Sequence, residues 1–169
     1  MHVSSSILAL AAAAVIPSVS AQNGGNTTCA QGLYMIVARG SNEPEGEGRL
    51  GPIVDTVLGR IRGSDAIGLD YPATIDDPVY MESVAEGGKA MKSAVEEYHD
   101  ACPNGRIAVL GYSQGAHISL DALCGGSVDG FEELTPLPLD LIESSSKNHE
   151  IQGIFFFTLA LGIDKLIHQ

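Results

Sequence analysis

Basic residues are scarce in this 169-residue sequence, which has nine Lys and Arg against 21 Asp and Glu. The formal net charge of −12 argues against nucleic acid, anionic membrane surfaces and polyanionic substrates as partners. Long apolar runs are also missing, since none reaches the roughly 20 residues that a helix needs to span a bilayer. We therefore expect a protein that binds neither nucleic acid nor membranes.

The amino-terminal segment carries a short apolar run of the kind found in secretory signal peptides. Ile7–Ile16 is uninterrupted, Pro17 ends it, and Val19-Ser20-Ala21 supplies the small residues of a cleavage site. No Lys or Arg precedes the run. We predict a signal peptide over residues 1–21 and a secreted, extracellular protein; a buried N-terminal helix is the alternative. Residues 22–169 suffice for one domain but not for two.

Cysteine is also scarce, and its number is odd. Of Cys29, Cys102 and Cys124, one must lack an intramolecular partner in an oxidising compartment. Asn26 begins an Asn-Thr-Thr sequon just after the predicted cleavage site, so we predict a glycosylation site there.

The rest of the chain alternates between strand and helix patterns. Short apolar runs predict strands, and apolar residues at helical spacing predict helices. The predicted order is strand 33–38, helix 50–62, strand 66–71, helix 80–100, strand 106–110 and helix 114–123. This alternation is typical of an α/β fold whose parallel sheet is covered by helices on both faces.

The last strand and helix flank the pattern Gly-x-Ser-x-Gly at 111–115. In a nucleophile elbow of this kind, a tight turn between strand and helix exposes a serine hydroxyl. The two glycines avoid steric contact where strand and helix converge. The context therefore predicts Ser113 as a nucleophile in an α/β-hydrolase-type three-layer sandwich.

A serine nucleophile needs a histidine that takes its proton and a carboxylate that orients the imidazole. The oxyanion that forms next needs hydrogen-bond donors, and the backbone N–H of Gln114 is one by position. The loop after the first strand supplies the other in such folds, which nominates Ser41; an ordinary turn serine is the equal alternative. Such a site hydrolyses esters without a metal or a cofactor.

Three motifs resemble the cutinase/acetylxylan esterase family of secreted serine esterases. They are Ala38-Arg39-Gly40-Ser41, Gly111-Tyr112-Ser113-Gln114-Gly115-Ala116 and Asp121-Ala122-Leu123-Cys124-Gly125-Gly126, and the similarity covers roughly residues 29–140. The resemblance implies Ser113 as nucleophile, Gln114 and Ser41 as the oxyanion hole, and a Cys29–Cys102 disulfide. It also implies a substrate among acetylated xylan-type polysaccharides or cutin-like polyesters of the plant cell wall.

After about Leu141 the family motifs stop, and the tail 142–169 diverges. The Asp and His of the catalytic triad are not identifiable: Asp140 with His149, and Asp164 with His168, lie in no recognisable motif. His117 lies one turn after Ser113 on the same predicted helix, which does not suit a base. The missing motifs and the unpaired Cys124 both suggest a truncated or altered end.

The apolar segment 151–163 has two interpretations, a further strand of the sheet or part of a lipid-anchor signal. Two functions remain open. The first is a monomeric serine esterase acting through an acyl-enzyme on Ser113. The second is a catalytically inactive family member, either a fragment or a binding module, and the missing motifs predict little or no esterase activity for this 169-residue product.

Overall fold

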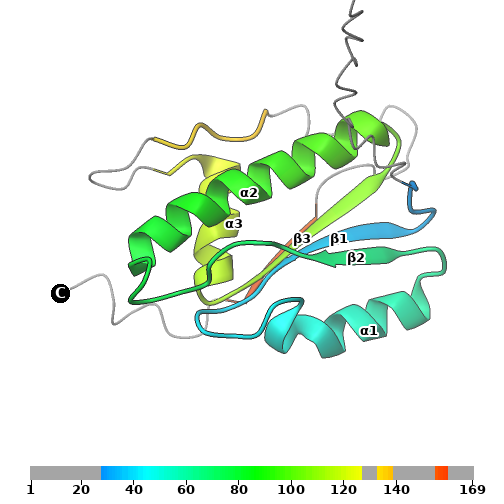
Figure 1. Cartoon of the computed structure of the whole chain (residues 1–169). Coiled ribbons are helices and arrows are strands. Elements are labelled where there is room, and N and C mark those ends of the chain that lie inside the picture. The colour runs from blue at the N-terminus through cyan, green and yellow to red at the C-terminus, as the bar shows by residue number, and fades with distance from the viewer. Residues whose placement is uncertain (1–27, 127–132, 139–154, 160–169) are drawn as a thin grey trace, which may run out of the picture.

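The computed structural model describes residues 28–126, 133–138 and 155–159 (Figure 1). The predicted signal peptide and the sequon at Asn26 lie outside these residues. In chain order the elements are β1 (Leu33–Ala38), the 3-10 helix η1 (Gly48–Leu50), α1 (Gly51–Arg60), β2 (Asp65–Gly68), α2 (Tyr80–Ala101), β3 (Arg106–Tyr112), α3 (Gln114–Cys124) and β4 (Phe155–Leu159).

The strands form one parallel sheet in the order β2-β1-β3-β4. At its centre, Ile36 of β1 pairs with Ile67 of β2 and with Val109 of β3. Figure 1 shows α1 on one face of the sheet and α2 with α3 on the other. This arrangement confirms the predicted three-layer α/β fold.

Strand β1 supplies both hydrophobic cores because successive side chains of a strand point to opposite faces. Ile36 and Ala38 join the core under α2 and α3. Met35 and Val37 join the smaller core under α1. All four side chains are fully or almost fully buried, so β1 reads as a continuous apolar run.

Helices α2 and α3 approach each other closely at Gly87. A Cβ at this position would lie 3.0 Å from the ring of Tyr71 and would collide with the side chain of Ile118 on α3. The buried face of α2 follows the predicted apolar stripe, with Val84, Met91 and Val95 almost fully buried.

Some boundaries differ from the prediction. Strand β2 ends at Gly68 instead of residue 71. Leu69 still donates its N–H to the carbonyl of Val37, but the next carbonyls bond the side chain of Arg39 instead of the sheet. Helix α1 ends at Arg60, since Ile61 is extended with φ −108° and ψ 98°.

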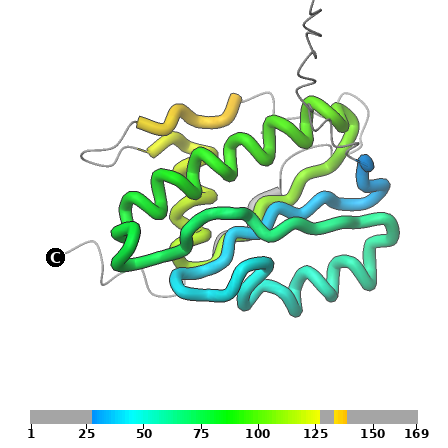
Figure 2. The backbone as a smooth tube through the Cα atoms, viewed as in Figure 1, coloured from blue at the N-terminus to red at the C-terminus, as the bar shows by residue number. Residues whose placement is uncertain are grey.

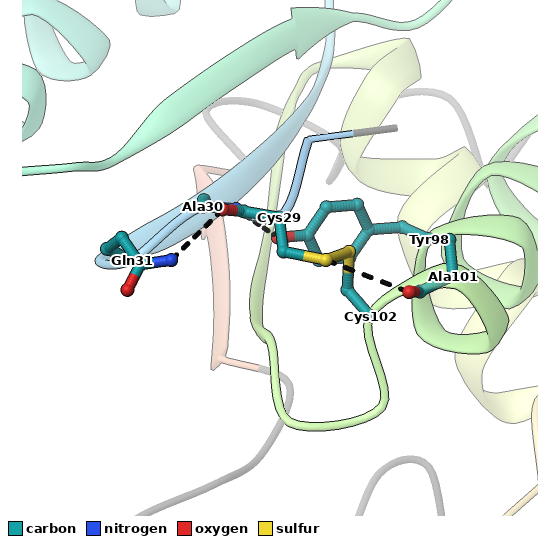
Figure 3. Close-up of a disulfide and its surroundings, with 6 residues drawn as sticks. All are labelled: Cys29, Ala30, Gln31, Tyr98, Ala101 and Cys102. Carbon is teal, nitrogen blue, oxygen red and sulfur yellow. Dashed lines mark hydrogen bonds between the residues drawn. A yellow bond between two sulfur atoms is a disulfide. The ribbon is translucent and has the colours of Figure 1, made fainter. Parts of the chain in front are cut away.

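The Cys29–Cys102 disulfide implied by the family resemblance is confirmed, and Cys124 is free and exposed. The disulfide joins the segment before β1 to the end of α2 (Figure 3). Beside it, the N–H of Ala30 donates to the hydroxyl of Tyr98 at 3.0 Å. The ring of Tyr98 stacks on the ring of Tyr34, with 3.7 Å between the ring centroids. The hydrogen bond and the ring stack of Tyr98 both lie at the amino-terminal edge of the sheet.

The tail contributes β4, which pairs in parallel with β3 from Ala108↔Phe155 to Tyr112↔Leu159. Within segment 151–163, the interpretation as a further strand therefore holds for residues 155–159. In the described part of the chain, no helix has the length and apolar character needed to cross a membrane.

Candidate active site

Ser113 lies in a tight turn between β3, which ends at Tyr112, and α3, which begins at Gln114. Its backbone has φ 53° and ψ −115°, and its carbonyl accepts the N–H of Ala116 at 2.9 Å. The predicted order of strand, turn and helix is therefore present. The role of Ser113 as nucleophile remains a prediction from the sequence.

The glycines of the motif allow this turn to pack against the end of β1. A Cβ on Gly115 would collide with the carbonyl of Ala38, and a Cβ on Gly111 with the carbonyl of Gly115. The hydroxyl of Ser119 donates to that same Gly115 carbonyl at 2.7 Å. A side chain at 115 would thus push α3 away from β1, and a side chain at 111 would push α3 away from β3.

The loop that follows β1 lies beside the elbow, at the carboxyl edge of the sheet. Because Ala38 pairs with Gly111, the residues after each strand come level with one another. A Cβ on Gly40 would lie 2.8 Å from the ring of Tyr112, so the loop backbone packs directly against the residue before Ser113. In Figure 2 the loops after β1 and β2 both lie at the end of the sheet where β3 enters α3.

Ser41 lies in a turn of this loop, which the N–H of Glu43 closes by donating to the carbonyl of Gly40 at 3.3 Å. Within the part of the chain that the structure describes, neither the N–H nor the hydroxyl of Ser41 has a hydrogen-bond partner. Ser41 is thus a turn residue at the same edge as Ser113. Its role as an oxyanion donor remains a prediction.

Gln114 has a structural role that the sequence did not reveal. Its side chain is fully buried, and Nε2 donates to the carbonyls of Thr74 at 2.9 Å and Tyr80 at 3.4 Å. The hydroxyl of Ser83 lies 3.5 Å from Oε1. The side chain therefore holds the 74–80 loop, while the N–H of Gln114, at the start of α3, is among the N–H groups without an intrahelical acceptor.

Arg39 is the second residue that sequence reasoning missed. It is only 5% exposed, and its guanidinium donates to the carbonyls of Glu43, Leu69 and Tyr71 at 3.1, 3.1 and 2.7 Å. It also lies over the ring of Tyr71, 5.0 Å from the centroid. Burial raises the pKa of Tyr71 above its ordinary value, against the opposing effect of the nearby guanidinium. An arginine directly after a buried strand was the available signal.

His117 is held away from the elbow. Its Nε2 lies 3.5 Å from Oδ2 of Asp121, and its Nδ1 lies 3.4 Å from the hydroxyl of Tyr80. Burial raises the pKa of Asp121, and His117 partly lowers it. Burial also raises the pKa of Tyr80, and the charge of Asp121 adds to that effect.

The other described histidine, His99, lies in the last turn of α2 next to the disulfide, at the opposite edge of the sheet. The candidate pairs Asp140 with His149, and Asp164 with His168, lie outside the described residues. Within residues 28–126 and 133–138, the structure therefore assigns no base to Ser113.

A shallow cavity of about 480 Å³ lies in the loop after β1. It is lined by Asn42, Glu43, Pro44, Glu45, Gly48 and Arg49. The cavity adjoins the turn that contains Ser41, so there is open space beside the candidate site.

Comparisons with known proteins agree with this geometry. A family model described as Cutinase matches residues 29–158 and so extends beyond Leu141 into β4. Acetylxylan esterase 2 of Talaromyces purpureogenus is 36% identical over 99 residues, which cover 56% of this chain and 42% of that protein. Cutinase 11 of Verticillium dahliae is 35% identical over 103 residues, which cover 58% of this chain and 35% of that protein.

Among solved structures, the catalytic core domain of acetyl xylan esterase from Trichoderma reesei is similar, with a TM-score of 0.59 and 29% identity. The similarity covers 64% of this chain and 55% of that one. The chain spans less than half the length of the two curated relatives. The matched region contains the sheet, the elbow and the disulfide, and on this evidence the chain belongs to the cutinase family.

Proposed function

We propose that this protein is a serine esterase that hydrolyses carboxylic esters through an acyl-enzyme on Ser113. The observation that carries the proposal is the position of Ser113 in the turn between β3 and α3, next to the loop that contains Ser41. Family membership supports the same reaction class, because the named relatives are esterases.

The chemistry follows from the groups at this edge. Ser113 Oγ bonds to the acyl carbon while its proton passes to a histidine, and the carbonyl oxygen becomes an oxyanion. The N–H groups of Gln114 and Ser41 are the proposed donors to that oxyanion. The tetrahedral intermediate expels the alcohol, which takes the proton from the histidine. Water then attacks the acyl-enzyme by the same steps and frees Ser113.

The proposed substrates are acetyl groups on xylan-type polysaccharides or cutin-like polyesters of plant-wall material. Two relatives support one alternative each, since one is named an acetylxylan esterase and the other a cutinase. We further propose that the protein is secreted and acts as a monomer. The disulfide supports secretion, because such bonds persist in oxidising compartments.

The direct test is hydrolysis of p-nitrophenyl acetate by the purified protein, with Ser113→Ala as the matched control. The proposal predicts turnover by the wild type and a loss of at least about 1,000-fold in the variant, as expected when a nucleophile is removed. Equal rates for the two proteins would overturn it. A mass increase of one acetyl group on the peptide that contains Ser113, trapped at early times, would identify the acyl-enzyme.

The second candidate is a catalytically inactive family member that keeps the elbow as a fragment or a binding module. The observation that favours it is that neither described histidine is available to Ser113, because His117 pairs with Asp121 and His99 lies at the other edge. If wild type and Ser113→Ala are equally inactive while both fold, this candidate replaces the first. If the wild type is active instead, the rates of His149→Ala and His168→Ala would show which of these histidines is the base.

A further inference from the structure

Burying the charged side chain of Arg39 costs free energy. A buried cation loses its hydration, and hydrogen bonds must replace it. Here the carbonyls of Glu43, Leu69 and Tyr71 accept from the guanidinium, and the Pro72 carbonyl lies 3.5 Å from Nη2. These carbonyls belong to the loops after β1 and β2, so one side chain joins the two loops at the edge that contains Ser113.

Further bonds fix the turn itself. The hydroxyl of Tyr71 donates back to the carbonyl of Arg39 at 2.5 Å. The carboxylate of Glu43 accepts the N–H of Gly40 at 2.8 Å, and it forms an ion pair with Arg49 at 3.1 Å. From the β2 side, the carbonyl of Ala73 accepts the N–H of Asn42 at 2.6 Å.

Among the described residues, these bonds leave a single backbone N–H of the turn without an acceptor. Of the four N–H groups in the turn 40–43, those of Gly40, Asn42 and Glu43 have acceptors. The N–H of Ser41 has none among the described residues. Hydrogen bonds from three of its N–H groups thus hold the turn, and the N–H of Ser41 is left without an acceptor among the described residues, at the edge where Ser113 lies.

We propose that Arg39 is a positioning residue of the esterase site, whose buried guanidinium, with Glu43, holds the 40–43 turn so that the N–H of Ser41 serves the oxyanion beside Ser113. The inference rests on the proposed esterase function. Arg39 itself does not touch the substrate, since its side chain is buried and its donors are engaged. Its effect belongs to the chemical step, because an oxyanion donor acts mainly in the transition state.

The first arm of the test is Arg39→Met, which keeps an aliphatic stem and removes the donors, with Arg60→Met on the exposed end of α1 as the charge-matched control. Amide hydrogen exchange measured by NMR should accelerate at Gly40, Asn42 and Glu43 by about 10-fold or more, as expected when a local segment is released. Ile36 in the sheet should keep its rate. Unchanged exchange in the turn would overturn the proposal.

The second arm is the hydrolysis of p-nitrophenyl acetate. We expect Arg39→Met to lower kcat by about 100-fold with KM changed by less than about threefold, since displacing an oxyanion donor affects the transition state selectively. Arg39→Lys should recover only part of the loss, because an ammonium cannot reproduce the planar fork. Arg60→Met should match the wild type. A folded Arg39→Met with kcat within about twofold of the wild type would overturn the proposal.

A further variant covers the case in which Arg39→Met does not fold. Tyr71→Phe removes only the hydroxyl that bonds the Arg39 carbonyl, and we expect kcat to fall by about three- to tenfold, the effect of one hydrogen bond. An unchanged kcat would count against the proposal. If Ser113→Ala matches the wild type, the esterase function itself fails and the catalytic part of the inference fails with it, while the exchange data still decide whether Arg39 holds the turn.

Discussion

Oδ2 of Asp121 lies 3.5 Å from Nε2 of His117, one turn earlier on α3, and the hydroxyl of Tyr80 lies 3.4 Å from the other ring nitrogen. Both nitrogens of the histidine closest to Ser113 in the sequence therefore face partners other than the serine. A general base must lie within hydrogen-bond reach of the proton it takes. His117 instead joins α3 to the start of α2.

His117→Gln tests this structural role. We expect the Ser113-dependent rate to stay within about threefold of the wild type, because Gln keeps polar atoms for its partners. The free energy of unfolding in urea should fall by about 0.2–1 kcal/mol, the range for a partly exposed pair. A folded variant whose rate is lower by more than about 100-fold would instead make His117 the base.

The raised pKa of Asp121 predicts a dependence of stability on pH. A carboxyl with a raised pKa binds its proton more tightly in the folded state, so its stabilising contribution is full below the ordinary value of 3.8 and is lost as the pH rises through the folded pKa. Asp121→Asn cannot ionise. The stability of the wild type relative to this variant should therefore decrease as the pH rises from below 3.8 through the folded pKa of Asp121.

Urea unfolding at several pH values measures this difference. Asp55→Asn, on the exposed side of α1, is the matched control for the loss of one carboxylate. A difference that stays constant with pH for Asp121→Asn would contradict the explanation by burial.

The sequence predicted the framework well because its elements depend on local patterns. Strand β1 has the predicted bounds, and α2 and α3 each end within one residue of the prediction. The predicted end of β2 was wrong because the actual end depends on Arg39. The guanidinium of Arg39 binds the carbonyls that a longer strand would offer to β1. A contact between residues 30 positions apart leaves no periodic signal.

Gly115 and Gly59 form a matched pair for the packing of the elbow. A Cβ on Gly115 would collide with the Ala38 carbonyl, so we expect Gly115→Ala to lower the free energy of unfolding by about 1–3 kcal/mol or more. Gly59 lies in α1 with open space around it, and Gly59→Ala should raise stability by about 0.5–1 kcal/mol. Thermal unfolding measures both; a neutral Gly115→Ala would contradict the close approach of β1 and α3.

The disulfide gives a further prediction. Cys29 and Cys102 are 73 positions apart. Replacing both cysteines with serine should lower the free energy of unfolding by about 4 kcal/mol in the chain-entropy model. Cys124→Ser should change it little, because Cys124 is free and exposed. Non-reducing peptide mapping should join Cys29 to Cys102. A link from Cys124 to either residue would contradict this pairing.

The candidate site was predictable only where a motif names its residues. Ser113, Gln114 and Ser41 came from short patterns around strand ends, and all three lie at the carboxyl edge of the sheet. The side-chain roles of Gln114 and Arg39 escaped because both bond backbone carbonyls of distant loops, whose positions no residue type encodes. The candidate Asp and His pairs of the tail lie outside both the motifs and the described residues.

The backbone at Ser113 has one last consequence. Its φ of 53° with ψ −115° is a conformation that glycine adopts freely and that a side chain disfavours, typically by about 1–3 kcal/mol. Folding alone would therefore do better with glycine at position 113. A comparison of Ser113→Gly with Ser113→Ala would measure how much stability the chain gives up to display a hydroxyl there.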